Sequence, residues 1–233
     1  MKQFIFSLIT LVTLSACHFK SGSGNIISET RAVGNFTGIS VGGGFEVEVK
    51  IGPIPEVIVE ADDNIIKYIE TTTSGNTLKI RTEDMHNYSD VHMKVYITTP
   101  ALISVKASAS AEVVVKDVLV SKEKLSFKAS SGGNIQAEVD GPEIETDVSS
   151  GASVNLNGKT KKYSAEASSG ADIKTYDLLS EITKVKVSSG ASAKVHASVT
   201  LNATASSGGT VSYLGAATVS NTVSSGGSIV KKD

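Results

Sequence analysis

The residues that could perform chemistry are few and far apart in this chain of 233 residues. It has one cysteine, Cys17, and four histidines, at positions 18, 86, 92 and 196. His86 and His92, with Asp84 and Asp90 beside them, are the one group that could supply several ligands to a metal ion. Their spacing matches neither a zincin helix nor an i, i+2 pair on a strand, so we interpret them as polar residues of a loop. We therefore expect no metal site and no cofactor.

Acid–base and nucleophilic catalysis find little support either. None of the serine pairs of the chain lies in a Gly-x-Ser-x-Gly elbow. β-Helical folds host polysaccharide lyases and hydrolases, which gather acids on one face. Here the acids stand at different positions of the repeat described below and mix with lysines, as on a solvated face: Glu138, Asp140, Glu145, Asp147, Glu166 and Asp172. We favour a chain that is not an enzyme and has no catalytic residues, and a carbohydrate-active enzyme stays open as the alternative.

Cys17 is the residue with the clearest chemical role. It follows a short positive head, Met1-Lys2-Gln3, and an apolar run from Phe4 to Leu14 that is too short to span a bilayer as a permanent helix. The segment Leu14-Ser15-Ala16-Cys17 looks like a bacterial lipobox, in which cleavage before the cysteine leaves a lipidated N-terminus. We therefore expect residues 1–16 to be a lipoprotein signal peptide and Cys17 to be lipidated, because several acyl chains on one residue hold durably in a membrane. A residue other than Asp after the cysteine favours the outer membrane, with the periplasmic or surface face left open.

A repeated phrase, Ser-Ser-Gly-(Gly/Ala), organises the C-terminal half. Its glycines are Gly132, Gly151, Gly170, Gly190, Gly208 and Gly226. Three residues before each glycine stand Ala129, Val148, Ala167, Val187, Ala205 and Val223, and three residues after stand Ile135, Val154, Ile173, Ala193, Val211 and Ile229. The residue between the glycine and the later apolar position is polar in every copy: Asn134, Ser153, Asp172, Ser192, Thr210 and Ser228.

This alternation on both sides of a glycine corner predicts a strand, a turn and a second strand in each copy. A near-constant period of about 20 residues is typical of stacked repeats, in which each unit buries its apolar face against its neighbours. Weaker copies surround Ser110 and Gly44. We predict an all-β fold, a β-helix-like stack with about 18–20 residues per coil. The handedness stays open.

The N-terminal part departs from the repeat and predicts a cap. Val57-Ile58-Val59 indicates a strand, the turn Ala61–Asn64 could cap a short helix over Ile65–Glu70, and Ser74-Gly75-Asn76 indicates a hairpin. We expect an antiparallel portion that covers one end of the stack, since an exposed strand edge invites pairing with other chains. The predicted organisation is a flexible tether within residues 17–29 and a single β-repeat domain over 30–233. The domain consists of a capping part, 30–105, and the Ser-Ser-Gly repeats, 106–233.

Composition narrows the possible partners. The net charge of −2, with signs interspersed, argues against a nucleic-acid surface. A lone cysteine excludes intramolecular disulfides, so the fold depends on burial and strand ladders. Aromatic residues make up 5% of the chain and tryptophan is absent, as suits a narrow interior.

The N-terminal part contains Arg31-Ala32-Val33, then Phe36–Val41 with Gly43–Val47, then Val57–Asn64 and Gly75–Ile80, and the serine repeats follow. Together these stretches resemble the head GIN domain family of adhesin-like lipoproteins of Bacteroidetes. The resemblance covers about residues 30–230. It implies an all-β stack of strands displayed at the cell envelope, and it supplies no catalytic residues.

We therefore expect an envelope lipoprotein that binds or scaffolds at the cell surface through a repeated face and not a pocket. The candidate surface comprises Ser153, Asp172, Ser192 and Thr210, beside the serine pairs. Its regular polar groups suit an extended glycan, or a matrix or envelope partner, through multivalency. The lipid would attach the protein to the membrane, and the oligomeric state stays open.

Overall fold

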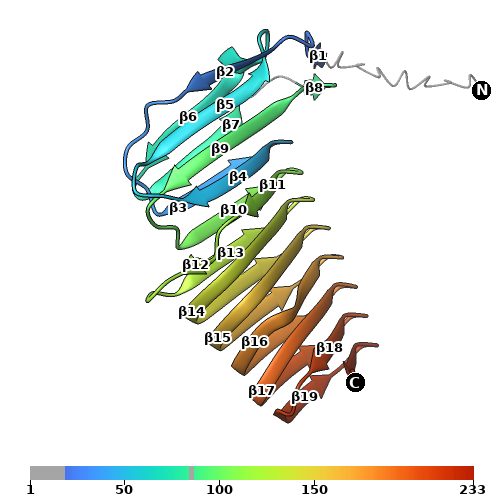
Figure 1. Cartoon of the computed structure of the whole chain (residues 1–233). Coiled ribbons are helices and arrows are strands. Elements are labelled where there is room, and N and C mark those ends of the chain that lie inside the picture. The colour runs from blue at the N-terminus through green and yellow to red at the C-terminus, as the bar shows by residue number, and fades with distance from the viewer. Residues whose placement is uncertain (1–18, 84–86) are drawn as a thin grey trace, which may run out of the picture.

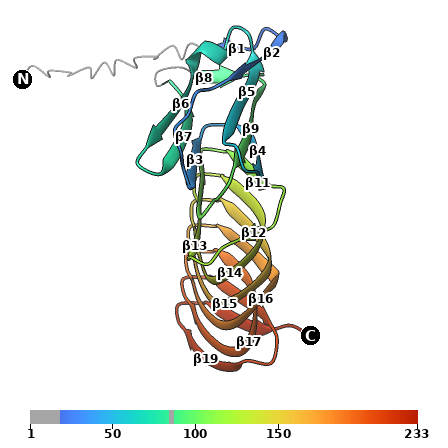
Figure 2. The same cartoon turned by 60° about the vertical axis from the view of Figure 1, so that its left-hand side comes forward.

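A computed structural model describes residues 19–83 and 87–233 (Figure 1). These residues form a β-solenoid, in which flattened coils stack along one axis and each coil contributes a strand to each of two facing layers (Figure 2). The predicted all-β stack of coils is confirmed. No helix of the described residues is long and apolar enough to cross a membrane.

The strands of the stack pair in parallel with the strands of the coils before and after. They are β10 (Ser104–Ser108), β11 (Glu112–Val115), β12 (Leu119–Val120), β13 (Leu125–Ala129), β14 (Asn134–Val148), β15 (Ser153–Ala167), β16 (Asp172–Val187), β17 (Ser192–Ala205), β18 (Thr210–Leu214), β19 (Thr218–Val223) and β20 (Ser228–Lys231). Strands β14 to β17 bend in the middle, so that their first halves lie in one layer and their second halves in the other. We call the layer that leads into the serine corners the first sheet, and the layer that leaves them the second sheet.

Equivalent positions of the repeat stack directly on one another. Asn134 pairs with Ser153, Ser153 with Asp172, Asp172 with Ser192, and Ser192 with Thr210. The inward columns are therefore continuous. Their members from Ala129 to Ala205 and from Ile135 to Val211 are at most 4% exposed. This burial in neighbouring coils is what one coil cannot achieve alone.

Each serine corner is a tight β-turn with two successive left-handed residues. In the third copy the N–H of Ala171 donates to the Ser168 carbonyl over 3.2 Å. The six glycines have φ between 69° and 76°, as predicted, and the serines before them have φ between 47° and 54°. Two positive φ values inside an i to i+3 hydrogen bond define a type I′ turn. A serine in this conformation was not predicted, since only glycine adopts it without steric cost.

The opposite bend of each coil is irregular, because the number of residues there varies. The ladder slips between Asn155 and Gly158, and again beside Leu179 and Ser180. Buried hydroxyls provide the hydrogen bonds that the slipped ladder lacks. Ser180 donates to the His196 carbonyl over 2.5 Å, and Thr175 donates to the Lys194 carbonyl over 2.8 Å.

The N-terminal cap extends both sheets by further strands, and its first and eighth strands form a separate two-stranded sheet. They are β1 (Phe19–Ser21), β2 (Ile26–Thr30), β3 (Gly38–Gly42), β4 (Glu46–Ile51), β5 (Glu56–Asp62), β6 (Ile69–Ser74), β7 (Thr77–Thr82), β8 (Asn87–Ser89) and β9 (Met93–Thr99). Strands β3 and β4 pair in parallel with β10 and β11, which makes the weak copies around Gly44 and Ser110 true coils. Strand β7 is parallel to β3, and β9 to β4, whereas the outermost pairs, β6–β7, β5–β9 and β2–β5, are antiparallel. An antiparallel cap at one end is therefore confirmed for the outermost strands.

Two local predictions in the cap are corrected. The helix expected over Ile65–Glu70 is a single 3₁₀ turn, η1 (Ile66–Tyr68), whose N-cap residue, Ile65, makes no side-chain capping hydrogen bond. The threonine-rich segment that follows this turn forms strand β6, which pairs with β7. The segment around Asp84 and Asp90, which is expected to be a polar loop, contains β8, and this strand is parallel to β1.

The segment expected to be a flexible tether is also different, at least over residues 19–25. Strand β1 begins at Phe19. The chain is then tied to the turn after β5: Gly24 N–H donates to Oδ1 of Asp62 over 2.7 Å, and the Ser23 hydroxyl donates to Oδ1 of Asp63 over 2.6 Å. The acidic turn thus holds the N-terminal segment on the cap, which no local sequence pattern indicates.

Candidate functional site

The structure brings the predicted binding residues into one straight column on the second sheet. Ser153, Asp172, Ser192 and Thr210 lie on four successive coils, with Asn134 before them and Ser228 after. All are partly exposed. Strand spacing puts the members about 4.8 Å apart. The column is a flat strip and not a hollow.

Neighbouring members of this column bond to each other. The Ser153 hydroxyl donates to Oδ1 of Asn134 over 2.9 Å, and the Ser192 hydroxyl donates to Oδ1 of Asp172 over 2.5 Å. The ammonium of Lys174 lies 3.4 Å from Oδ2 of Asp172. The side chains are therefore held in place before any partner arrives, which lowers the entropic cost of binding.

The corner beside this column presents a second line of hydroxyls. The left-handed serines are exposed: Ser131, Ser150, Ser169, Ser189, Ser207 and Ser225. Backbone hydrogen bonds lock each corner to the next, as when Gly170 N–H donates to the Ser189 carbonyl over 3.1 Å. We call these six serines, together with the column from Asn134 to Ser228, the serine edge.

On the first sheet, a column of charges runs parallel to the serine edge. Lys106, Lys128, Asp147, Glu166 and Lys186 pair in register on five successive coils. The expectation that the acids stand at different repeat positions is wrong for Asp147 and Glu166, since both precede the first serine of their copy by two residues. Lys128 lies 3.9 Å from Asp147, and Lys186 lies 3.2 Å from Glu166. Both carboxylates are more than half exposed, so solvated ion pairs explain them.

Shallow hollows accompany this charged column. One of about 270 Å³ lies between Glu166, Lys186 and Ser188, and one of about 180 Å³ lies between Lys106, Lys128 and Ser149. A larger one, about 450 Å³, lies at the irregular bend opposite the serine edge, where Lys159, Leu179 and Glu181 line it. The sequence predicts binding through a repeated face and not a pocket, and these hollows lie on the surface, outside the inward apolar columns.

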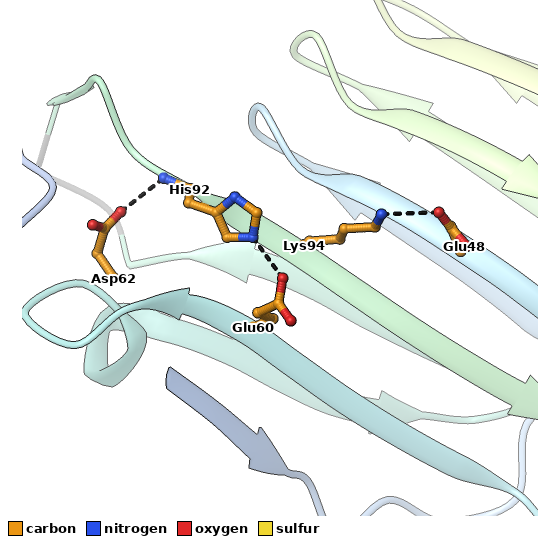
Figure 3. Close-up of polar contacts among 5 residues, drawn as sticks. All are labelled: Glu48, Glu60, Asp62, His92 and Lys94. Carbon is orange, nitrogen blue, oxygen red and sulfur yellow. Dashed lines mark hydrogen bonds and ion pairs between the residues drawn. The ribbon is translucent and has the colours of Figure 1, made fainter. Parts of the chain in front are cut away.

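The cap has its own group of ionisable side chains on the outer face of β5, β9 and β4 (Figure 3). Nε2 of His92 lies 2.8 Å from Oε1 of Glu60. Both oxygens of the buried Asp62 accept backbone N–H groups, from Gly24 and from His92, each over 2.7 Å. Asp62 is therefore satisfied by the fold and has a structural role.

Lys94 and Glu48 form the second pair in Figure 3, at 2.9 Å. The hydrogen bond from Lys94 lowers the pKa of Glu48, and the same bond raises the pKa of Lys94. Both groups remain charged at neutral pH and neutralise each other, as in an ordinary surface ion pair.

Among the described residues, we find no group of side chains arranged as a catalytic or metal-binding site. Within 19–83 and 87–233, no three His, Cys, Asp or Glu side chains are arranged to hold a metal ion. Asp84 and His86 lie outside those ranges, as does Cys17. Sequence reasoning overlooked Gly38-Ile39-Ser40-Val41-Gly42, which has the spacing of a nucleophile elbow. Ser40 lies in the middle of β3 and not on a strand-to-helix turn, so it lacks the geometry of that motif.

The fold and the serine edge define a class of protein: an elongated β-solenoid with a repeated, partly charged surface and a capped N-terminal end. Residues 35–217 match the family "Putative auto-transporter adhesin, head GIN domain", and the chain belongs to this family.

Solved structures show the same fold. A "putative adhesin" from Bacteroides fragilis has a TM-score of 0.83 at 17% identity, with 91% of this chain and 99% of that chain covered. One from Parabacteroides merdae has a TM-score of 0.73 at 17% identity, covering 92% and 99%. A "Putative lipid binding protein" from Parabacteroides distasonis has a TM-score of 0.72 at 18% identity, covering 93% and 100%. No curated protein matches the chain.

Proposed function

We propose that the chain is a non-enzymatic, adhesin-like lipoprotein of the cell envelope that binds an extended partner along its serine edge. The observation that carries the proposal is the register of the column. Asn134, Ser153, Asp172, Ser192, Thr210 and Ser228 succeed one another on consecutive coils, each partly exposed. Regularly spaced weak donors and acceptors favour a long ligand that contacts several coils at once.

The chemistry of the strip indicates a polar partner, such as a glycan chain. Hydroxyl, amide and carboxylate groups offer both donors and acceptors to sugar hydroxyls. The charged column on the other side of the corner, from Lys106 to Lys186, would favour a chain that also carries charges. Membership of an adhesin family is consistent with binding at the cell surface.

The anchor is proposed from the lipobox, with Cys17 as the acylated residue and the outer membrane as its location. Strand β1 begins only two residues later, at Phe19, and lies in the cap (Figure 1). The acyl chains would therefore hold the cap close to the bilayer, and the coils would project away from it. Such an orientation leaves the serine edge accessible along its whole length.

A glycan and matrix-protein array tests the proposal. It is probed with the chain from residue 17 onward carrying Cys17→Ser, so that no acyl chain contributes to binding. We expect retention that increases with the length of the ligand, and ligands that are recovered intact after long incubation. Shortened or unsaturated products would instead favour the carbohydrate-active enzyme. Equal binding to short and long ligands would contradict a repeated site.

A further inference from the structure

The irregular bends opposite the serine edge stack into an edge of their own, on the side of the solenoid that carries β12 (Figure 1). We call it the far edge. From the cap towards the C-terminal coils its bends are residues 51–55, 116–124, 140–143, 159–162, 177–182 and 197–200. The Ile51 N–H donates to Oδ2 of Asp117 over 2.8 Å, which ties the first bend to the second. Successive bends of the stack are therefore about one strand spacing apart, about 4.8 Å.

The far edge concentrates exposed apolar side chains at its two ends. More than half of the large apolar side chains that residues 19–83 and 87–233 leave exposed lie on it. They are Ile51, Ile54, Val118 and Val120 in the first two bends, and Leu179, Ile182 and Val199 in the last two. Val120 is 77% exposed and Ile54 is 75% exposed. Such a concentration along one edge is typical of a surface that binds another macromolecule.

The two middle bends carry charges of opposite sign. Bend 140–143 contributes Asp140 and Glu143, and bend 159–162 contributes three lysines, at positions 159, 161 and 162. Lys161 and Lys162 are exposed and form no ion pair within the part of the chain that the structure describes. Six lysines and six acids balance over the six bends. The far edge therefore lacks the net positive charge that would attract an anionic membrane or a nucleic acid.

We propose that the far edge binds the far edge of a second copy of the chain in antiparallel orientation. A two-fold axis perpendicular to the solenoid axis can pass between bends 140–143 and 159–162. This axis sets the acidic bend of each copy on the lysine bend of the other. Exposed lysines without an ion partner in their own chain then meet carboxylates, so the charges of the contact are complementary.

The apolar ends of the edge match under the same axis. Bend 116–124 of one copy falls on bend 177–182 of the other, so Val120 meets Leu179. Bend 116–124 is the longest of the six, and the surface that it meets is the hollow of about 450 Å³ that Leu179 lines. Ile51 comes opposite Val199 in the same way. Charge, apolar character and relief thus all repeat in reverse order about one point of the edge.

Parallel pairing of the two edges would lose this match. It would set lysines against lysines and acids against acids, which costs affinity. The antiparallel contact is isologous and uses the far edge of both copies, so it closes at a dimer. Its footprint of about 24 Å by about 10 Å is small beside the roughly 800 Å² per partner of stable complexes, so we expect a weak dimer.

The pair leaves the two serine edges facing outward on opposite sides, with the two caps at opposite ends. Anchored copies would therefore come from two opposed membranes, a consequence that rests on the proposed anchor. The contact itself rests on the far edge alone. Its failure would leave the proposed anchor and the proposed binding along the serine edge untouched.

Sedimentation equilibrium tests the contact, with the chain from residue 17 onward carrying Cys17→Ser, from about 10 μM to about 1 mM. We expect a reversible monomer–dimer equilibrium. Lys161→Glu combined with Lys162→Glu makes both middle bends acidic and should raise the dissociation constant about tenfold or more. Asp140→Lys combined with Glu143→Lys makes both bends basic and should have the same effect.

Mixing these two double variants provides the decisive arm. Each acidic bend again meets a basic bend, so the mixture should form a heterodimer with a dissociation constant within about threefold of the unsubstituted dimer. Lys79→Glu combined with Lys194→Glu is the matched control. It changes the net charge equally at two exposed positions away from the far edge, and it should leave the dissociation constant within about twofold.

Three results would overturn the inference. The first is a monomer at every concentration. The second is a tighter dimer of the Lys161→Glu, Lys162→Glu variant, since a parallel pair would gain from losing its facing lysines. The third is a monomer that floats with vesicles of phosphatidylcholine and phosphatidylglycerol, which would show that the apolar ends of the far edge contact lipid.

Discussion

The Ser192 hydroxyl donates a hydrogen bond to Oδ1 of Asp172, one coil away, over 2.5 Å. Ser153 and Asn134 form the equivalent pair two coils earlier. The candidate binding strip therefore consists partly of hydrogen-bonded pairs and not of independent hydroxyls. A ligand meets side chains that are already oriented, and each side chain still has unused lone pairs or donors.

Backbone strain at the corners predicts a cost for replacing their glycines. Gly170 has φ +70°, and a Cβ added there would meet nothing within 4 Å. We expect Gly170→Val to destabilise the protein by about 1–3 kcal/mol, from the left-handed backbone alone. Chemical denaturation measures the change. Gly44→Val is the matched control, since Gly44 has equally open space and a φ outside the left-handed region. Equal losses in both variants would contradict the role of φ.

Buried hydroxyls at the irregular bend predict a second stability effect. Ser180 and Thr183 bond to each other, and Ser180 also donates to the His196 carbonyl over 2.5 Å. Thr183 is 1% exposed and Ser180 is 2% exposed. Ser180→Ala should destabilise the fold by about 1–3 kcal/mol, because it removes two hydrogen bonds from a buried network and leaves the Thr183 hydroxyl to donate to the His196 carbonyl over the longer distance of 3.4 Å. Ser164→Ala, on the outer face of β15, should change the unfolding free energy by less than about 0.5 kcal/mol.

Tyr163 predicts a dependence of stability on alkaline pH. Burial raises the pKa of Tyr163 to about 12, against about 10 in an unfolded chain. Between these pH values the phenol loses its proton in the unfolded state but keeps it in the folded state. The contribution of Tyr163 to the free energy of unfolding is therefore complete below pH 10 and is lost as the pH rises towards 12. The loss amounts to about 2–3 kcal/mol. Urea unfolding between pH 9 and pH 12 measures it, and Tyr163→Phe should lose that much less stability over the same range. An identical pH dependence in both proteins would contradict the assignment.

Acylation of Cys17 is a further prediction that a single variant tests. Mass spectrometry of the membrane-extracted protein should show a chain that begins at Cys17 and carries the mass of acyl groups. Cys17→Ser should release the protein from the membrane fraction or strand it with its signal peptide. An unmodified Cys17 in the mature chain would refute the lipobox interpretation.

The regular part of the fold could be predicted because each coil repeats one local rule. Apolar residues three before and three after a corner glycine fix which face is inward, and a one-residue slip would turn every side chain over. The same spacing placed Ser153, Asp172, Ser192 and Thr210 in one column. The same spacing also places Asp147 and Glu166 in one column, because both residues stand two positions before their serine pairs. The sequence analysis overlooked this match.

Other features depend on contacts that the sequence pattern does not contain. The left-handed conformation of Ser169 is imposed by the stack of corners, since a serine alone has little preference for it. The slipped ladder beside Leu179 depends on how many residues cross the far bend. The attachment of Gly24 to Asp62 joins positions 38 residues apart, so a segment rich in glycine and serine resembles a tether until the cap is in place.

The most direct test of a repeated binding surface is a graded substitution series along the serine edge. Ser153, Asp172 and Ser192 are changed to Lys singly, in pairs and all together, and the affinity for the best long ligand from the array is measured by titration. If the three residues contribute similar binding free energies, each substitution should weaken binding by a comparable factor, about two- to tenfold. The factors of the single substitutions should then multiply in the combined variants. Loss of all binding on one substitution, with no effect from its two neighbours, would show a discrete site and contradict the account.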